Sequence, residues 1–218
     1  MSTVADTKSL NAPFLTRGRA ITAALAVILV GAMVYDTKVV QIGSEHDVRA
    51  DVFSPEAFGA ENFPKVRDSV VSRAVDATEL GSAIAADKAA AGTKYGVATS
   101  TGPVIPVKFT GTVGERKSST NTIAVPGLPE GTVVRVQTGP AINGTELRDA
   151  TGEIEFGQFT NQIEYQNAGS ALNNAMKKEV LASIDPAALE GKTVEITGVF
   201  KLINPKNWLV TPVAVTVK

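Results

Sequence analysis

The chain of 218 residues contains no cysteine, one histidine and one tryptophan. The lack of cysteine excludes disulfide bonds, a thiolate nucleophile, Cys-ligated zinc and attachment of lipid to a cysteine. A histidine-dependent triad would have to use His46, which stands in a polar stretch after an apolar segment. A solvated histidine is far commoner at such a position than a catalytic one.

The chain also lacks an excess of either charge. Its 21 Lys and Arg residues balance 22 Asp and Glu residues, which gives a formal charge of −1. Such a chain has no field that attracts nucleic acid or anionic headgroups, so we expect no nucleic-acid partner. With 44% hydrophobic and 20% charged residues, the composition is typical of a folded globular protein.

Common catalytic motifs are missing as well. The sequence has no G-x-x-x-x-G-K-[ST], no H-E-x-x-H and no G-x-S-x-G. Glu153 and Glu155 would share one face of a short strand, as a retaining pair of carboxylates does, although this pattern usually marks a solvated face. We therefore expect no enzyme, no catalytic residues, no metal and no cofactor.

An uncharged run of sixteen residues covers positions 20–35. As a helix it would rise about 24 Å, slightly less than the hydrocarbon core of a bilayer. Basic residues precede the run and mainly acidic residues follow it, so the positive-inside rule places residues 1–19 in the cytoplasm and the body outside. The run is a retained inner-membrane anchor, which Tyr35 favours, or a signal cleaved near Val30-Gly31-Ala32. A buried core helix is the third interpretation, and the lack of a polar face in the run disfavours it.

Residues 36–94 are predicted to form a linker and a small helical lobe. Ser54-Pro55 has the pattern of a helix start, with serine as the cap and proline at the first helical position. Pro64 is expected to start the helix anew, and Asp76 to cap a third helix. Gly92 is the expected end of that third helix.

Residues 95–218 change to an alternating pattern that is typical of strands. A helix capped by Asn161 is expected between the third and fourth strands, and the strands are expected at 104–113, 122–125, 132–137, 192–200 and 208–217. This is the order of the OB-fold barrel. The predicted fold class is α+β: an N-terminal transmembrane or signal helix, a helical lobe, and an OB-like five-stranded antiparallel β-barrel.

The connection before this helix holds the candidate binding residues. Asn143-Gly144 predicts a tight hairpin and Thr151-Gly152 a second, weaker one. Arg148 and Asp149 lie between them, and in a strand these adjacent residues would point to opposite faces. We therefore expect them not to pair. The candidates for ligand or partner contact are Asn143, Arg148, Asp149, Asn161 and Gln162. The more frequent roles of such residues are structural: Arg148 and Asp149 would fix the loop, and Asn161 would cap the helix.

Three segments carry a resemblance to a known family: GPAINGTELRDA at 139–150, FTNQIEY at 159–165 and GKTVEITGVFKL at 191–202. Over roughly residues 33–217 the chain resembles the DUF2291 family of uncharacterised bacterial predicted periplasmic lipoproteins. Members are often encoded beside sugar ABC transporters, which implies an accessory role with a permease or a sugar-binding protein as partner. The resemblance implies no site residues, and the chain departs from the lipoprotein pattern because it has no cysteine to acylate.

Taken with the residues, the resemblance implies a non-enzymatic binding or accessory module, tethered to the bacterial inner membrane, with its C-terminal domain in the periplasm. Cleavage of the apolar run would instead release it into the periplasm. One alternative is a periplasmic enzyme or sensor that acts on a small carbohydrate-type ligand through Arg148 and Asp149. A purely structural envelope protein is a third.

Overall fold

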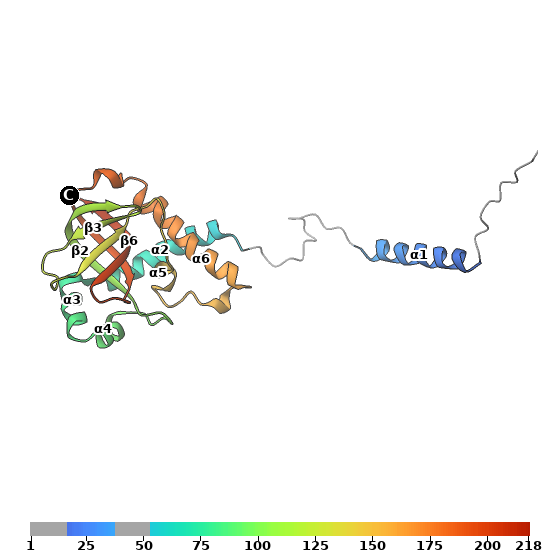
Figure 1. Ribbon diagram of the computed structural model, residues 1–218, viewed down its shortest axis with the longest axis horizontal. Helices are drawn as coiled ribbons and strands as arrows, with labels where there is room; N and C mark the ends of the chain where they lie inside the picture. The colour runs from blue at the N-terminus through green and yellow to red at the C-terminus, as the bar shows by residue number, and fades with distance from the viewer. Residues whose placement is uncertain (1–16, 38–52) are drawn as a thin grey trace, which may run out of the picture. The chain divides into compact units, whose positions relative to one another are not determined.

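The computed structural model describes residues 17–37 and 53–218 (Figure 1). Most of the predicted cytoplasmic segment 1–19, and His46, lie outside the described residues. The chain divides into two compact units, residues 1–52 and 53–218, and each is described by itself.

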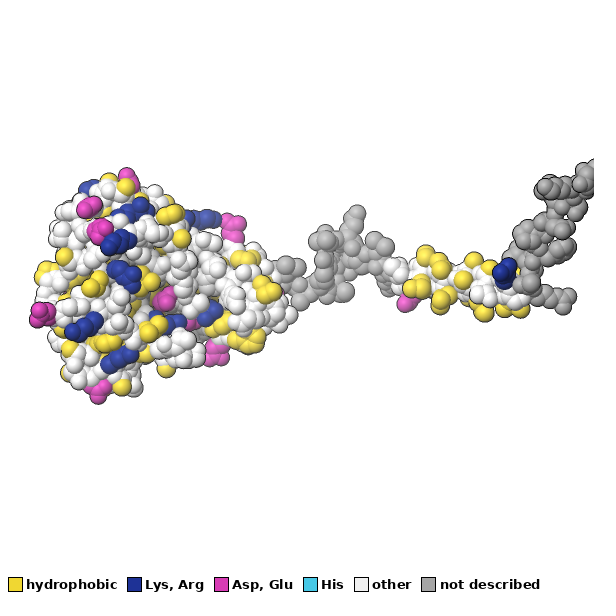
Figure 2. Space-filling model, in the orientation of Figure 1, with side chains coloured by type: hydrophobic (Ala, Val, Ile, Leu, Met, Phe, Trp, Pro, Cys, Tyr) yellow, Lys and Arg dark blue, Asp and Glu magenta, His cyan; other side chains and the backbone are white. Residues whose placement is uncertain are grey.

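The described part of the first unit is the helix α1 (Arg17–Asp36), which confirms the predicted apolar helix. Its apolar side chains are exposed along its length, as the space-filling view shows (Figure 2). By length and composition α1 is able to cross a membrane. A signal sequence near the N-terminus meets the same criterion, so α1 fits either a retained anchor or a cleaved signal.

The second unit is built around a closed barrel. Its strands pair in the order β2-β3-β4-β6-β5, and β5 pairs with β2 to close the ring. All of these pairs are antiparallel except β4 with β6, which is parallel. The strands are β2 (Val104–Lys117), β3 (Thr120–Ala124), β4 (Val133–Gln137), β5 (Thr193–Lys201) and β6 (Asn207–Val217). With a helix between β4 and β5, this is the predicted OB order.

Alternating side chains of the strands fill the barrel. Phe109 and Val113 on β2 are buried, while Thr110 and Thr112 between them are exposed. The rings of Phe200 and Trp208 stack in the interior with their centroids 4.7 Å apart.

A glycine allows the barrel to bend between β5 and β6. A Cβ on Gly198 would lie 2.5 Å from the carbonyl oxygen of Thr211, and the register shifts between Thr197 and Gly198. Only a residue without a side chain fits such a close approach.

Four elements precede the barrel: α2 (Pro55–Arg73), the short strand β1 (Val75–Asp76), α3 (Ala77–Ala86) and α4 (Lys88–Tyr95). The predicted caps are confirmed, because Ser54 Oγ accepts from the amide of Ala57 at 3.4 Å and Asp76 Oδ1 from that of Thr78 at 2.8 Å. β1 pairs in parallel with β2.

Two predicted helix boundaries are wrong. Helix α2 runs through Pro64 without a new start, because Phe63, Val66 and Val70 are buried on one continuous face. Gly92 lies inside α4, since Asp87 accepts bonds from the amides two and three residues later and starts a new helix there.

The helices share their cores with the barrel, so the predicted division between residues 36–94 and 95–218 does not separate two cores. Leu80 and Ile84 of α3 pack in the barrel core. Phe63 of α2 belongs to a second cluster with Val104 of β2 and with Leu172 of the helix α6 (Gln162–Met176). Helices α2 and α6 lie side by side (Figure 1).

The connection from β4 to α6 (Gln162–Met176) contains the short helix α5 (Glu146–Asp149) and the 3-10 turn η1 (Phe156–Gln158). The hairpins predicted at Asn143-Gly144 and Thr151-Gly152, and the strand expected at 153–156, are therefore wrong. Gln137 explains the first error: its amide accepts from the backbone N–H of Asn143 and donates to the carbonyl of Asn143, each at 2.8 Å. These two hydrogen bonds take the place of the cross-strand backbone hydrogen bonds that a hairpin would form.

After α6 the chain continues through a π-helical turn, η2 (Lys177–Leu181), and a 3-10 turn, η3 (Pro186–Ala188), to β5.

Candidate functional site

Three of the five predicted site residues meet in one open hollow, which we call the polar cleft. Arg148, Asp149 and Gln162 line it, and its volume is about 580 Å³. Its walls come from residues 97–101, the connection around α5, the start of α6 and the end of β5. Asn143 and Asn161 do not line it.

Arg148 and Asp149 form a buried ion pair at the wall of the polar cleft. Both Nε and Nη2 of Arg148 lie 2.8 Å from Asp149 Oδ1, and the two side chains are only 10% and 11% exposed. The prediction that they would not pair is wrong, because it assumed a strand, whereas α5 places neighbouring residues on a tight helical turn.

Further groups of the protein bind the two members of the pair. Thr145 Oγ1 donates to Asp149 Oδ2 at 2.7 Å, and Lys201 Nζ lies 3.6 Å from the same oxygen. Arg148 donates from Nη1 to the carbonyl of Tyr165 at 3.2 Å, and its guanidinium carbon is 3.7 Å from the centre of the Tyr165 ring. Arg148 therefore fastens α5 to α6.

Three other side chains of the polar cleft remain available to a ligand. In the described residues, neither the Gln162 amide nor the Tyr165 hydroxyl has a hydrogen-bond partner within the protein. The Phe156 ring is 50% exposed and meets the Tyr165 ring edge-on, with centroids 5.7 Å apart. An exposed ring beside planar polar groups suits a ligand that has both apolar faces and hydroxyl groups.

Near Arg148, Asp149 and Lys201, Glu146 is a half-buried carboxylate. Burial raises the pKa of Glu146, and attraction to Lys201 and Arg148 offsets this rise only in part.

Asn161 has a structural role in this fold, and Asn143 contributes backbone contacts. Asn161 Oδ1 accepts from the amide of Glu164 at 3.0 Å, so Asn161 caps α6 as predicted. The side chain of Asn143 is exposed, while its backbone is held by Gln137.

Sequence reasoning missed Lys201 and Phe156. No local pattern could have identified Lys201, because it reaches the cleft only through the pairing of β5 with β2. The exposure of Phe156 follows from the 3-10 turn that replaced the expected strand.

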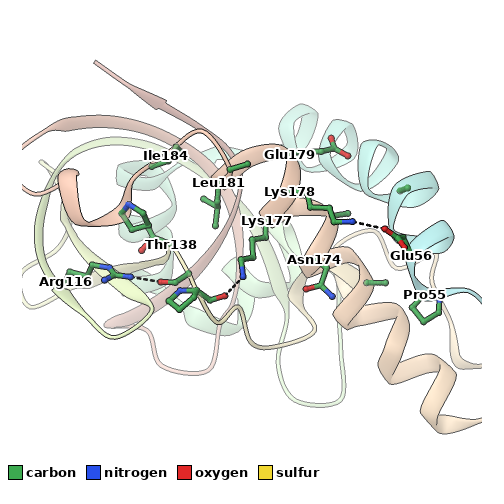
Figure 3. A pocket seen from close by; sticks show the side chains of 17 residues that line it. Pro55, Glu56, Arg116, Thr138, Asn174, Lys177, Lys178, Glu179, Leu181 and Ile184 are labelled. Atoms are coloured by element: carbon green, nitrogen blue, oxygen red, sulfur yellow. Dashed lines mark hydrogen bonds and ion pairs between the residues drawn. The ribbon is translucent and has the colours of Figure 1, made fainter.

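A second and larger hollow, which we call the apolar pocket, lies between α2, the end of α6 with η2, and one end of the barrel (Figure 3). Its volume is about 960 Å³. Ala171, Ala175, Leu181 and Ile184 contribute apolar walls. No residue of this pocket was a candidate in the sequence analysis.

A family model described as "Predicted periplasmic lipoprotein (DUF2291)" matches residues 23–216. The chain belongs to this family. The match covers the barrel, the helices packed on it and most of α1. The family description fits a membrane-anchored or periplasmic protein.

A solved structure with the same architecture is that of an OB-fold protein from Thermotoga maritima. It has a TM-score of 0.62 and 19% sequence identity, and the alignment covers 77% of this chain and 100% of the other. At this identity the likeness shows the fold alone. Comparison with curated proteins gives no match.

Proposed function

We propose that this chain is a membrane-tethered, extracytoplasmic binding module whose polar cleft holds a small carbohydrate-type ligand. The observation that carries the proposal is that the exposed Phe156 ring and the Gln162 amide, which has no partner among the described residues, line the same cleft. A sugar presents C–H groups on one face of its ring and hydroxyl groups at its edge, which matches these two kinds of contact.

The Arg148–Asp149 pair supports this proposal as a scaffold and not as the ligand contact. Because the pair fastens α5 to α6, it fixes the positions of Tyr165 and Gln162 in the first turns of α6. A preformed site costs less conformational entropy on binding than a mobile one. The barrel supplies the rigid frame on which this connection is held.

The ligand is tested with the full chain in phosphatidylcholine nanodiscs, by thermal shift against glucose, galactose, ribose, xylose and maltose. At least one sugar is expected to raise the melting temperature saturably. Phe156→Ala and Gln162→Ala should reduce the affinity for that sugar about tenfold or more, which corresponds to roughly 1.4 kcal/mol.

Asn161→Asp is the matched control, because it keeps the helix cap and lies outside the polar cleft. Equal sugar affinity in the wild type, Phe156→Ala and Gln162→Ala would contradict the cleft as the site. Turnover of a sugar by the wild-type chain would favour the enzymatic alternative.

The location is part of the proposal. The family description and the apolar α1 support it, as does the order of charges, with Arg19 before the apolar run and Asp36 after it. A reporter that is active only outside the cytoplasm, fused after Lys218, should be active. A reporter that works only in the cytoplasm would contradict the proposed orientation. Retention of an N-terminal tag on the mature protein distinguishes an anchor from a cleaved signal.

We further propose a permease or a sugar-binding protein of an ABC transporter as the partner. The support is the family resemblance, since relatives are often encoded beside such transporters. Crosslinking in intact cells, followed by affinity purification in mild detergent, should recover one of these components. Recovery of the chain alone after efficient crosslinking would count against this partner.

A further inference from the structure

The apolar pocket is separate from the polar cleft and shares no lining residue with it. Its volume of about 960 Å³ is in the range of sites that hold small organic molecules. An inference about it does not rest on the proposed function of the polar cleft.

Two cations of the apolar pocket have no carboxylate partner in the part of the chain that the structure describes. Arg116 Nη2 donates to the carbonyl of Gly139 at 2.9 Å, and Lys177 Nζ donates to that of Pro140 at 2.8 Å (Figure 3). Neither takes part in an ion pair among residues 53–218. Arg116 and Lys177 therefore give the apolar pocket two positive charges that no carboxylate of the described residues balances.

The carboxylates of the apolar pocket are already neutralised. Glu56 lies 2.8 Å from Lys178 Nζ, and this hydrogen bond lowers the pKa of Glu56. Glu179 lies 3.2 Å from Nη1 of Arg67. The pocket is lined by three cations and two anions, so its net charge is positive.

Two buried N–H donors at this end of the barrel have no acceptor within the described residues. They are Arg116 Nε and Asn121 Nδ2, and Asn121 is fully buried. Thr138 Oγ1 donates to Asn121 Oδ1 at 2.7 Å, so the NH₂ end of the amide is the end without a partner. Asn121 lines a small interior cavity that shares Thr138, Leu181 and Ile184 with the apolar pocket.

These features select a ligand of one chemistry. Within the apolar pocket, the unmatched Nε of Arg116 and the two cations Arg116 and Lys177 favour a ligand that accepts hydrogen bonds and carries negative charge. A sugar does not fit, because it brings donors as well as acceptors and would leave the alanine and leucine walls against hydroxyl groups. An inorganic anion alone would leave the apolar walls of the pocket exposed to water.

We propose that the apolar pocket binds an amphiphile with an acyl chain and one anionic head group. The head lies at Arg116 and Lys177, and the chain lies along Ala171, Ala175 and Leu181. A free fatty acid and an anionic membrane lipid share this chemistry, and the test separates them.

The test uses the full chain in phosphatidylcholine nanodiscs and equilibrium dialysis with radiolabelled decanoate, with empty nanodiscs as the blank. Saturable binding of one decanoate per chain is expected. Decanol, which lacks the charge, should bind at least about tenfold more weakly, and inorganic phosphate should not displace decanoate. Equal affinity for decanoate and decanol, or displacement by phosphate, would overturn the proposal.

A matched pair of variants on one helical turn locates the head group. Lys177→Gln should weaken decanoate binding about tenfold or more. Lys178→Gln should change it less than about twofold, since Lys178 is paired with Glu56. Both lysines are exposed, so neither change threatens folding. Unchanged binding in Lys177→Gln, or equal losses in the two variants, would show that the head does not lie there.

The source of the ligand is tested by comparing nanodiscs of two lipid compositions. Replacing part of the phosphatidylcholine by phosphatidylglycerol should displace decanoate if the natural ligand is a membrane lipid. Decanoate binding that is the same in both nanodiscs identifies a free carboxylate amphiphile. Either result must show the Lys177 dependence, and its loss would overturn the proposal.

Discussion

The polar cleft and the apolar pocket use charged side chains in opposite ways. In the cleft, Arg148 and Asp149 satisfy each other and are buried. In the pocket, the partners that Arg116 and Lys177 have among residues 53–218 are backbone carbonyls, which do not balance their charge. A charged residue in a hollow is therefore a poor guide to a binding site until its partners are known. In the cleft the charges stabilise the fold, and in the pocket we propose that they bind a ligand.

The sharpest way to test this difference is to break the buried pair. Arg148→Met leaves the carboxylate of Asp149 buried without its main partner, and the free energy of unfolding should fall by roughly 3–5 kcal/mol. Arg67→Met removes an arginine whose pair with Glu179 is more exposed, and should cost less than about 1 kcal/mol. Urea unfolding measures both. Similar small losses in the two variants would contradict the structural role of Arg148.

The wall of the apolar pocket depends on a close approach of α2 to α6. A Cβ on Gly59 would lie 2.6 Å from the carbonyl oxygen of Ala171, so Gly59→Ala should destabilise the protein by about 1–3 kcal/mol. Gly157→Ala is the control, since a Cβ there meets nothing within 4 Å, and it should change stability by less than about 0.5 kcal/mol. A Gly59→Ala variant with wild-type stability would show that the helices are farther apart.

The cap of α6 should have a smaller effect. Asn161→Ala removes the acceptor for the amide of Glu164 and should cost about 0.5–2 kcal/mol, while Asn161→Asp should cost much less. The melting temperature and urea midpoint report the change. Sugar binding should follow stability alone. If Asn161→Ala melts normally but no longer binds sugar, Asn161 is a contact residue after all.

Glu146 gives the smallest effect, and it depends on pH. Because burial raises the pKa of Glu146, the folded state holds its proton more tightly than the unfolded state does. Stability is therefore lost as the pH rises from the ordinary value near 4.5 through the raised folded pKa. Glu146→Gln should match the wild type at low pH and exceed its stability at pH 7, whereas Glu153→Gln, at an exposed position, should not. A Glu146→Gln variant that gains nothing at pH 7 would contradict the burial.

The strand order and the caps could be predicted from the sequence because they depend on local patterns. Alternation marked all five barrel strands, and Ser54, Asp76 and Asn161 each cap the helix expected of them. These features need only neighbouring residues to satisfy backbone groups.

The predictions that failed depended on distant contacts. Asn143-Gly144 has the local pattern of a hairpin, yet Gln137 holds Asn143 and the Asn173 amide donates to the carbonyl of Gly144 at 3.0 Å. Pro64 stays within α2 because tertiary packing of that helix outweighs the local tendency to stop.

The proposed binding residues were hard to identify for the same reason. Arg148 and Asp149 stand out in the sequence, but their partners Tyr165 and Lys201 come from other elements, and these contacts support a scaffold role. Arg116 and Lys177 are separated by about sixty residues and meet at one pocket only through the folded barrel.

Hydrogen exchange of the full chain in nanodiscs, measured by mass spectrometry with each ligand in turn, tests most directly whether the two hollows are separate sites. The sugar that shifts the melting temperature should slow exchange at residues 97–101 and 155–165, and decanoate at 138–140 and 171–186. Neither ligand should protect the region of the other. Protection of the same residues by both ligands, or protection by decanoate around Arg148 and not around Lys177, would contradict the account.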